Sequence, residues 1–308
     1  MPFYLIIIQL ALVPALSPLF VGIIRKIKAK FQNRAGASIF QPYRDLRKLF
    51  NKDEVISADS SWIFRSAPYL IFSASLVLAA NIPILTVTAP GGLVGDLLTV
   101  IYLIALGTFC LALAGLDTGG AFGGFGSSRE MTFASLAEGG LMFSLLVPAI
   151  LSHSSNLFTI AGNISILSFF SFAPIIIAFA AFIISMLAET ARFPFDNPAT
   201  HLELTMIHEA MILEYSGKRL ALVEWAAANK LFIFLALGVN LFFPWGIPPS
   251  VSLAVVGFSL VLFFVKALAL CLAVAILESI TAKFRFFRLA DLLFTSFILS
   301  VIALCLVI

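Results

Sequence analysis

Charged residues are scarce in this chain of 308 residues, in which Lys, Arg, Asp and Glu together make up 11%. Soluble globular proteins carry about 25%. Hydrophobic residues account for 61% and form long runs with almost no charge, the pattern of helices that cross a lipid bilayer. These proportions exclude an ordinary soluble domain. The net charge of +3, without a basic patch interleaved with aromatic residues, also excludes a nucleic-acid partner.

Cysteine and histidine are also rare, with three residues of each. Cys110, Cys271 and Cys305 lie inside apolar runs, where cysteine behaves as a small hydrophobic residue, so we expect neither a disulfide scaffold nor a metal site. His201 and His208 lie among acidic residues, but their spacing is not the H-E-x-x-H of a zinc-binding helix. We therefore expect no metal ligands and no catalytic residues in this chain.

Eight apolar runs predict eight membrane-spanning helices, and hence an all-α integral membrane protein. The runs fall at 2–24, 63–89, 96–114, 131–151, 166–188, 228–248, 251–277 and 290–308. The first run lacks a charged leader and a small-residue cleavage site, so we expect it to remain as a span. No internal repeat or low-complexity linker divides the chain, which we expect to form a single transmembrane domain over residues 1–308.

The loops between these runs differ sharply in charge. Three short loops near 90–95, 152–165 and 244–250 contain no Lys, Arg, Asp or Glu. Most of the charge lies in long loops that we place at about 25–62, 115–130, 189–227 and 278–289. Because positively charged loops stay on the cytoplasmic side, the pattern predicts cytoplasmic long loops and both termini outside.

One long loop contains a short amphipathic segment. Pro42 suits the first turn of a helix. The positions that follow alternate between apolar and basic residues at helical spacing: Tyr43, Leu46, Leu49 and Phe50, with Arg44, Arg47 and Lys48. The segment predicts a helix on the membrane surface, which is either a lipid anchor or a docking site for a partner protein.

Two further loops have features of their own. The stretch Gly119–Gly126 is rich in glycine, but it lacks the Lys-Ser/Thr of a phosphate-binding loop and follows a span, so we expect a flexible or tightly packed turn. The segment 189–224 mixes acidic and apolar residues. That mixture is typical of a loop folded against a partner protein around a partly enclosed cavity.

Several charged residues lie inside or beside the predicted spans, where a charge is costly and is therefore a functional candidate. They are Asp96, Glu138, Glu189, Lys266 and Glu278. Asp96 adjoins an uncharged loop and is interpreted as a solvated end or a helix cap. Glu278 lies near the inner end of its span and could extend to the membrane surface or pair with Lys283. Glu138 and Lys266 have no such structural explanation, so we assign them to a proton path.

Four motifs follow one another along the chain. They are Asn33-Arg34-Ala35-Gly36 continuing through Gln41-Pro42 and Asp45 to Lys48-Leu49-Phe50; Gly115-Leu116-Asp117-Thr118-Gly119-Gly120 leading to Ser127-Ser128-Arg129-Glu130; Arg129 nine residues before Glu138; and Ala188-Glu189-Thr190-Ala191-Arg192-Phe193-Pro194-Phe195-Asp196 followed by Glu214-Tyr215-Ser216-Gly217. Over nearly its whole length the chain resembles the H-type membrane subunit of respiratory complex I and of the related membrane-bound (group 4) nickel–iron hydrogenases, including formate hydrogenlyase.

The second motif and the string Phe243-Pro244-Trp245-Gly246 are more similar to the hydrogenase branch than to the quinone-reducing branch. Two features depart from complex I relatives. Ala37 stands where those proteins usually have Pro, and Ala199 and His201 stand within what is usually a run of carboxylates, of which Glu203 remains. The loop that takes up protons in that family is therefore altered here.

The resemblance implies a non-catalytic subunit that anchors a redox complex in the cytoplasmic (inner) membrane of a prokaryote and couples it to proton translocation. It implies no cofactor on this chain. The implied partners are hydrogenase-like large and small subunits, an iron–sulfur subunit and antiporter-like membrane subunits, with lipid around them. Iron–sulfur clusters would lie on the partners, together with a nickel–iron centre if the large one contains two paired Cys-x-x-Cys motifs.

The resemblance also implies roles for particular residues. Those expected in the proton pathway are Glu138, Glu189, Glu203, Glu214, Lys266 and Glu278. Those expected in loops at the interface are Arg34, Arg44, Arg47, Asp117, Arg129, Glu130, Arg192 and Asp196. Two alternatives remain: a quinone-binding subunit of a respiratory complex I and, more distantly, a stand-alone ion transporter. The transporter is disfavoured because the sequence shows neither an inverted repeat nor paired broken helices.

Overall fold

The computed structural model describes the whole chain except residues 1–2, 58, 88–93, 166–171, 197–205, 247–252, 283 and 285. The described residues form helices connected by turns. These helices are α1 (Phe3–Phe31), α2 (Gln41–Phe50), α3 (Trp62–Ala80), α4 (Leu97–Asp117), α5 (Ala121–Ser152), α6 (Leu157–Ile164), α7 (Phe172–Glu189), α8 (His208–Ile212), α9 (Gly217–Leu241), α10 (Leu253–Ile280) and α11 (Phe286–Cys305).

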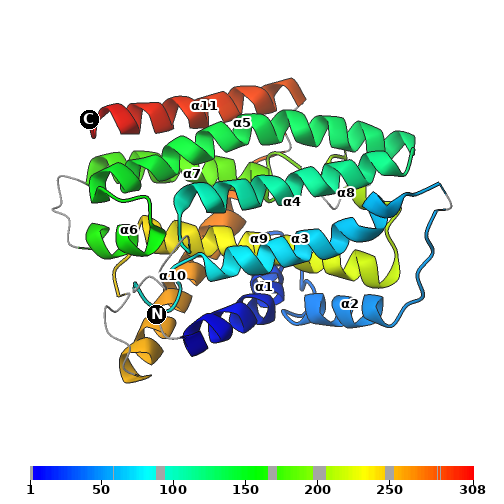
Figure 1. The fold of residues 1–308 in the computed structure, drawn as a ribbon, viewed down its shortest axis with the longest axis horizontal. Coiled ribbons are helices and arrows are strands. Elements are labelled where there is room, and N and C mark those ends of the chain that lie inside the picture. Colours follow the sequence, from blue (N-terminus) through cyan, green and yellow to red (C-terminus); the bar gives the residue numbers. More distant parts are fainter. Residues whose placement is uncertain are drawn as a thin grey trace.

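Helices α1, α3, α4, α5, α9, α10 and α11 are long and apolar enough to cross a membrane, and α7 is a shorter apolar helix. They correspond to the eight predicted spans, so the prediction of an all-α integral membrane protein is confirmed. Most of them run side by side in Figure 1, while α10 crosses the bundle at a steeper angle. Both chain ends lie toward the left of that view, which we call the termini end; the opposite end, with α2 and α8, is the charged end.

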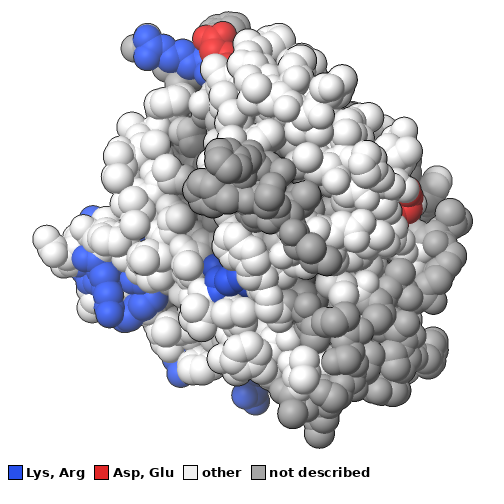
Figure 2. All heavy atoms as spheres, turned by 90° about the vertical axis from the view of Figure 1, so that its left-hand side faces the viewer, with Lys and Arg blue, Asp and Glu red and all other residues white. Residues whose placement is uncertain are grey.

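The two ends differ in charge as the sequence predicts. Figure 2 shows the termini end, where uncharged atoms dominate and coloured atoms are few. Here Asp96 caps α4 by accepting a hydrogen bond from the Thr99 amide at 3.2 Å, which confirms its interpretation as a helix cap. Asn156 caps α6 in the same way, at a short helix that the apolar runs did not predict.

The loop between α4 and α5 is much shorter than the 115–130 expected, because it comprises only residues 118–120. Most of the glycine-rich stretch forms the first turns of α5 instead. A Cβ atom on Gly123 would lie 2.3 Å from the Gly115 carbonyl oxygen, and one on Gly126 would lie 2.8 Å from the Ala210 Cβ. The glycines therefore allow α4, α5 and α8 to pack closely, which is the tightly packed option of the prediction.

The amphipathic segment forms α2, as predicted. Its apolar side faces the bundle: Pro42 is buried, and the ring of Phe50 lies 6.1 Å from that of Trp225 on α9 in an edge-on arrangement. Arg44 and Arg47 lie on the exposed side of the helix. Because intramolecular packing occupies the apolar side, α2 presents a basic face to its surroundings.

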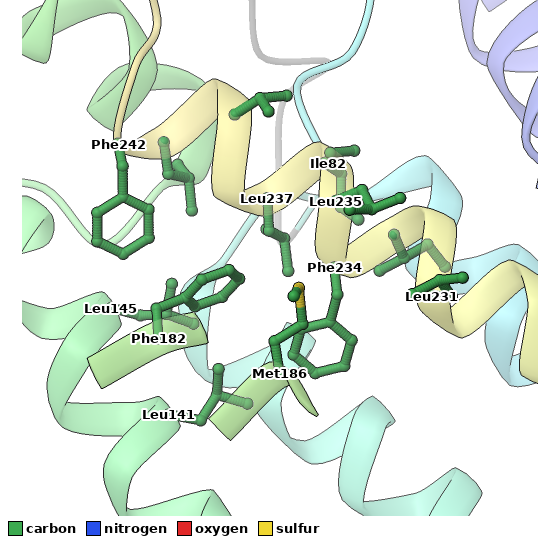
Figure 3. Close-up of a cluster of buried hydrophobic side chains, with 14 of the residues drawn as sticks. Ile82, Leu141, Leu145, Phe182, Met186, Leu231, Phe234, Leu235, Leu237 and Phe242 are labelled. Carbon is green, nitrogen blue, oxygen red and sulfur yellow. The ribbon is translucent and has the colours of Figure 1, made fainter. Parts of the chain in front are cut away.

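The middle of α9 passes through a fully apolar core. All residues from Leu231 to Val239 are buried, and none has a polar side chain. Figure 3 shows how side chains of α5 and α7 pack against this segment, among them Leu141, Phe182 and Met186. We call this region the apolar plug; it extends over about 14 Å of α9 at 1.5 Å per residue.

Candidate functional site

A cavity of about 380 Å³ lies between the helices on the charged side of the apolar plug. It extends from Asp45 of α2, at the charged end, to Leu231 of α9, where the plug begins. Helices α1, α3 and α4 contribute mostly apolar walls. Ionisable side chains from five further elements line the rest: Glu130, Glu189, Arg192, Asp196, His208, Glu209, Glu224 and Lys230, with Arg25 of α1.

A buried ion pair lies at the membrane-side limit of this cavity. Glu189 is the last residue of α7, and its Oε2 lies 2.7 Å from Nζ of Lys230 on α9. The same ammonium group donates to Thr108 Oγ1 on α4 at 2.9 Å. Only 2% of the Glu189 side chain and 21% of the Lys230 side chain are exposed. Glu189 Oε1 is buried with no hydrogen-bond partner among the described residues, so this oxygen can still accept a hydrogen bond.

Two further carboxyl groups of α5 lie within electrostatic range of this pair. The charges of Glu189 and Lys230 act on both Glu130 and Glu138. Glu130 lines the cavity, and Glu138 follows two helical turns later, about 12 Å further into the membrane. Glu138 is partly exposed on the outside of the bundle and makes no hydrogen bond or salt bridge with any described residue. A partly exposed carboxyl group in the middle of a span is costly in lipid and suits contact with another subunit.

Asp196 is buried and caps α8 at the charged end. It accepts hydrogen bonds from the Ile207 and His208 amides at 3.3 and 3.1 Å. Its negative charge also stabilises a protonated His208, but burial has the larger effect and lowers the pKa of His208 from its ordinary value of 6.5. His208 is therefore a neutral cavity-lining group at neutral pH.

Glu209 follows on α8 and faces the same cavity. Burial, together with the nearby carboxyl groups of Glu224 and Asp196, raises its pKa to about 7, against the opposing charge of Arg25. A carboxyl group with a pKa near 7 can bind and release a proton under physiological conditions. Glu209 is thus suited to proton exchange between the cavity and the charged end.

Glu278 connects three parts of the structure. Its two carboxylate oxygens lie 2.6 Å from Nζ of Lys28 on α1 and 2.6 Å from Nη1 of Arg192, in the segment after α7. The Glu278 side chain is 3% exposed. The partner considered from the sequence, Lys283, lies outside the described residues. With both oxygens paired, Glu278 holds α1, α10 and the segment after α7 together.

Other predicted residues occupy different positions. Asp117 caps α3 by accepting from the Ser61 amide, the Ser61 hydroxyl and the Phe64 amide at 2.8, 2.6 and 3.1 Å. The guanidinium of Arg129 lies 3.8 Å from the centre of the Phe125 ring. Arg34, Arg44, Arg47 and Glu214 are exposed at the charged end, away from the cavity. Glu203 lies outside the described residues.

Sequence reasoning missed Lys230, the base of the central ion pair. The apolar run that predicts this span begins at 228 and places Lys230 at the membrane edge, so the sequence indicates Lys266 as the one base deep in a span. In the structure α9 already begins at Gly217, so Lys230 lies near the middle of the helix. The stretch from Gly217 to the apolar run contains no helix breaker. This absence predicts a helix that begins before the apolar run, with Lys230 in its interior. Glu224 was missed for the same reason.

Among the residues that the structure describes, no group of three or more His, Cys, Asp or Glu side chains could hold a metal ion. The three cysteines lie on α4, α10 and α11 as free thiols. The described side chains therefore do not fit an iron–sulfur or nickel–iron centre.

These features define a polytopic membrane protein with a cluster of ionisable side chains inside the bundle. The chain belongs to the NADH dehydrogenase family, whose pattern it matches over residues 3–308. The resemblance inferred from the motifs is therefore confirmed.

The curated relatives include two from Escherichia coli (strain K12). The chain is 37% identical to hydrogenase-4 component C over 303 residues, which are 97% of this chain and 95% of that protein. It is 32% identical to formate hydrogenlyase subunit 4 over 279 residues, which are 91% of this chain and 90% of that protein. With the H-type subunit of NADH-quinone oxidoreductase from Paraburkholderia phymatum the identity is 27% over 229 residues, or 70% of this chain and 64% of that protein.

A solved structure has the same fold. It is a chain of the membrane-bound sulfane sulfur reductase, an archaeal respiratory membrane complex. The two chains superpose with a TM-score of 0.82 over 98% of this chain and 99% of the other, at 21% sequence identity.

Proposed function

We propose that this chain is the membrane-anchoring and proton-coupling subunit of a hydrogenase-type energy-converting complex related to complex I. The observation that carries the proposal is the Glu189–Lys230 ion pair, buried between a cavity at the charged end and the carboxyl group of Glu138. Two hydrogenase-type relatives that match over nine tenths of the chain support the choice of complex.

In this proposal the chain carries protons, and partner subunits carry electrons. Hydrogenase-like large and small subunits and an iron–sulfur subunit dock at the charged end, where they reduce protons to hydrogen. A change of charge there acts first on the cavity groups, such as Glu209, and then on the Glu189–Lys230 pair. Glu130 and Glu138 respond because they lie within range of that pair.

We propose that the coupling path leaves the Glu189–Lys230 pair sideways, through α5, and does not continue along α9. The apolar plug lies directly beyond Lys230 along α9, so a straight path through this helix would cross about 14 Å without a polar side chain. Glu138 instead is a partly exposed residue of α5. An antiporter-like membrane protein against α5 would receive the signal there and complete proton translocation.

We also propose an orientation. The charged end carries most of the Lys and Arg, so it faces the cytoplasm, and both termini lie on the outer side of the inner membrane of a prokaryote. Arg34, Arg44 and Arg47 then face the peripheral subunits. The exposed basic side of α2 favours partner docking over lipid anchoring by its apolar side.

A second candidate function is that of a quinone-binding subunit of a respiratory complex I. The cavity favours it, because apolar walls from α1, α3 and α4 face polar groups at one end, as in sites for amphiphilic ligands. The lower identity to the NADH-quinone oxidoreductase relative weighs against it. A stand-alone transporter has less support, because the plug separates Lys230 from the termini end.

The test is to purify the complex through a tag on this chain and to measure hydrogen evolution with reduced ferredoxin or a reduced viologen. We expect hydrogen to form. Quinone reduction is measured in the same preparation. Quinone reduction without hydrogen evolution, in a complex that contains all its subunits and metals, would replace the hydrogenase proposal with the second candidate.

A further inference from the structure

The ammonium group of Lys266 lies among oxygen atoms at the termini end of the bundle. It donates to the backbone carbonyls of Phe243 and Trp245 at 2.9 and 3.2 Å. It also lies 3.2 Å from the amide oxygen of Asn240 and 3.4 Å from the Val239 carbonyl. An ammonium group has three donors, so these four oxygens surround it as they would surround a small cation. We call them the oxygen cage.

Contacts with the neighbouring segments fix the oxygens of α9. Asn240 is fully buried, and its side-chain nitrogen donates to the Pro83 carbonyl at 2.7 Å, so its oxygen is directed toward Lys266. The Val239 carbonyl belongs to the last turn of α9. Carbonyl groups in a last turn have no partner within the helix and carry the negative end of the helix dipole. Both features favour a positive charge at this position.

The turn after α9 is fixed against α10. Gly246 has a φ of +86°, which only glycine adopts readily, and a Cβ atom there would lie 2.0 Å from Cδ2 of Leu262. Leu262 lies one helical turn before Lys266 on α10. The turn therefore lies directly on the part of α10 from which Lys266 extends, and this holds the Trp245 carbonyl in the oxygen cage.

The oxygen cage is neutral. None of the salt bridges among the described residues includes Lys266, in contrast to Lys230. The undescribed segment 247–252, which directly follows the turn, contains no Asp or Glu. Neutral carbonyl oxygens can replace the hydration shell of a monovalent cation, as they do in potassium filters. They cannot accept a proton from Lys266 at physiological pH.

We infer that the termini end of α9 is a monovalent-cation site, which the chain fills with its own Lys266 ammonium group. When this side chain is shortened, a free ammonium or potassium ion binds in its place. In the native chain the Lys266 ammonium group holds the turn after α9 against α10 and takes no part in proton transfer. This role replaces the proton-path assignment made for Lys266 from the sequence, and it is independent of the redox reaction of the complex.

The test uses the whole complex with Lys266→Ala, which opens the cage, and Lys266→Met, which fills it without a charge. The exposed Lys30→Ala is the matched control. Thermal unfolding is measured in N-methylglucamine chloride, and then in ammonium, potassium or tetramethylammonium chloride at equal ionic strength. We expect both Lys266 variants to unfold on the order of 5 °C lower in N-methylglucamine. Ammonium or potassium restores at least half of the loss in Lys266→Ala, and tetramethylammonium, which is too large, restores none.

Lys266→Met and the control should not respond to the cations. A loss in Lys266→Ala that no cation reverses would overturn the inference, because the lysine would then act through packing alone. Unchanged thermal stability with loss of proton translocation would overturn it too, because Lys266 would then be a proton carrier.

A second pair of variants tests the same inference if the complex with Lys266→Ala does not assemble. Asn240→Asp and Asn240→Leu both lose the hydrogen bond to Pro83, but only Asp offers Lys266 an oxygen. We expect the Asp variant to unfold at a higher temperature than the Leu variant. An equal or lower temperature would contradict the cage.

Discussion

Two lysines lie well inside membrane-spanning helices, and their surroundings differ in kind. Lys230 lies between a carboxylate and a hydroxyl group, beside a cavity lined by further acids. Lys266 lies among neutral oxygens, beyond the apolar plug. Proton exchange needs an acceptor that can change its charge, and this condition is met around Lys230 alone. In our two proposals the same residue type therefore serves coupling in one half of the molecule and architecture in the other.

The comparison also separates the two halves of the bundle. At the charged end, cation–carboxylate pairs join distant segments, as Glu278 joins Lys28 to Arg192. At the termini end, neutral hydrogen bonds join distant segments instead: Gln9 of α1 donates to the Ala79 and Ile82 carbonyls. Charge is thus concentrated where we propose that redox partners dock.

The largest expected effect is that of Glu189→Gln, which removes the charge opposite Lys230. Leaving one partner of a buried pair uncompensated destabilises a protein by about 3–5 kcal/mol. We expect a lower unfolding temperature of the complex, together with loss of proton translocation during hydrogen evolution.

The double variant Glu189→Gln with Lys230→Met separates the two effects. It should regain most of the stability, because no unpaired charge remains, but it should not regain translocation. Recovery of translocation in the double variant would show that the pair is structural, and the comparison between the two lysines would then fail. The exposed Asp59→Asn is the matched control.

Glu138→Gln is expected to change coupling and leave stability almost unaffected. Glu138 has no hydrogen bond or salt bridge with the described residues, so the substitution should change the unfolding free energy of the protein by about 0.5 kcal/mol or less. Subunits should assemble normally, and hydrogen should evolve without proton movement. The measurement is proton uptake into vesicles that contain the complex; normal uptake would reject the sideways relay.

Glu209 gives a pH dependence of defined sign. Its pKa in the folded chain is about 7, above the ordinary 4.5, so the folded chain binds this proton more tightly than the unfolded chain. The resulting stabilisation is complete below about pH 4.5 and is lost as the pH rises through about 7. Burial has the largest effect on this pKa, followed by Glu224 and Asp196, which raise it, and by Arg25, which lowers it, while His208 lines the same cavity.

Glu209→Gln imitates the protonated form, so its unfolding temperature should fall less between pH 5 and pH 8 than that of the wild type. Thermal unfolding at a series of pH values measures this difference. Identical curves for the two proteins would contradict the burial of Glu209. The exposed Glu214→Gln serves as the control.

The smallest expected effect is at the surface. Arg44→Glu with Arg47→Glu reverses the charge of the exposed side of α2, and exposed charges contribute about 1 kcal/mol or less each. We expect the peripheral subunits to bind several-fold more weakly, and more so at low salt. Co-purification in detergent measures this, with Lys30→Glu as the control. Unchanged co-purification at low salt would remove α2 from the docking surface.

The sequence predicted the membrane-spanning helices, the contrast in charge between their connections, the amphipathic helix α2 and the family. Each of these follows from local physics. Backbone groups in lipid must bond within their own segment, so a long apolar run is a helix wherever it lies in the fold. Positively charged residues avoid crossing the membrane, and helical spacing fixes which side chains of α2 share a face.

The tertiary structure decided which charged side chains form ion pairs. Glu189 and Lys230 are 41 positions apart, and Lys28 and Glu278 come from opposite ends of the chain. Such pairs depend on the rotation of each helix about its axis and on where it begins, and α9 begins eleven residues before the apolar run that predicted it. The contacts of Lys266 required more still: the end of one helix, a glycine turn and a neighbouring helix had to meet. The apolar pattern of a span specifies that it is buried, but many rotations bury it equally well, and only packing against the other helices selects one.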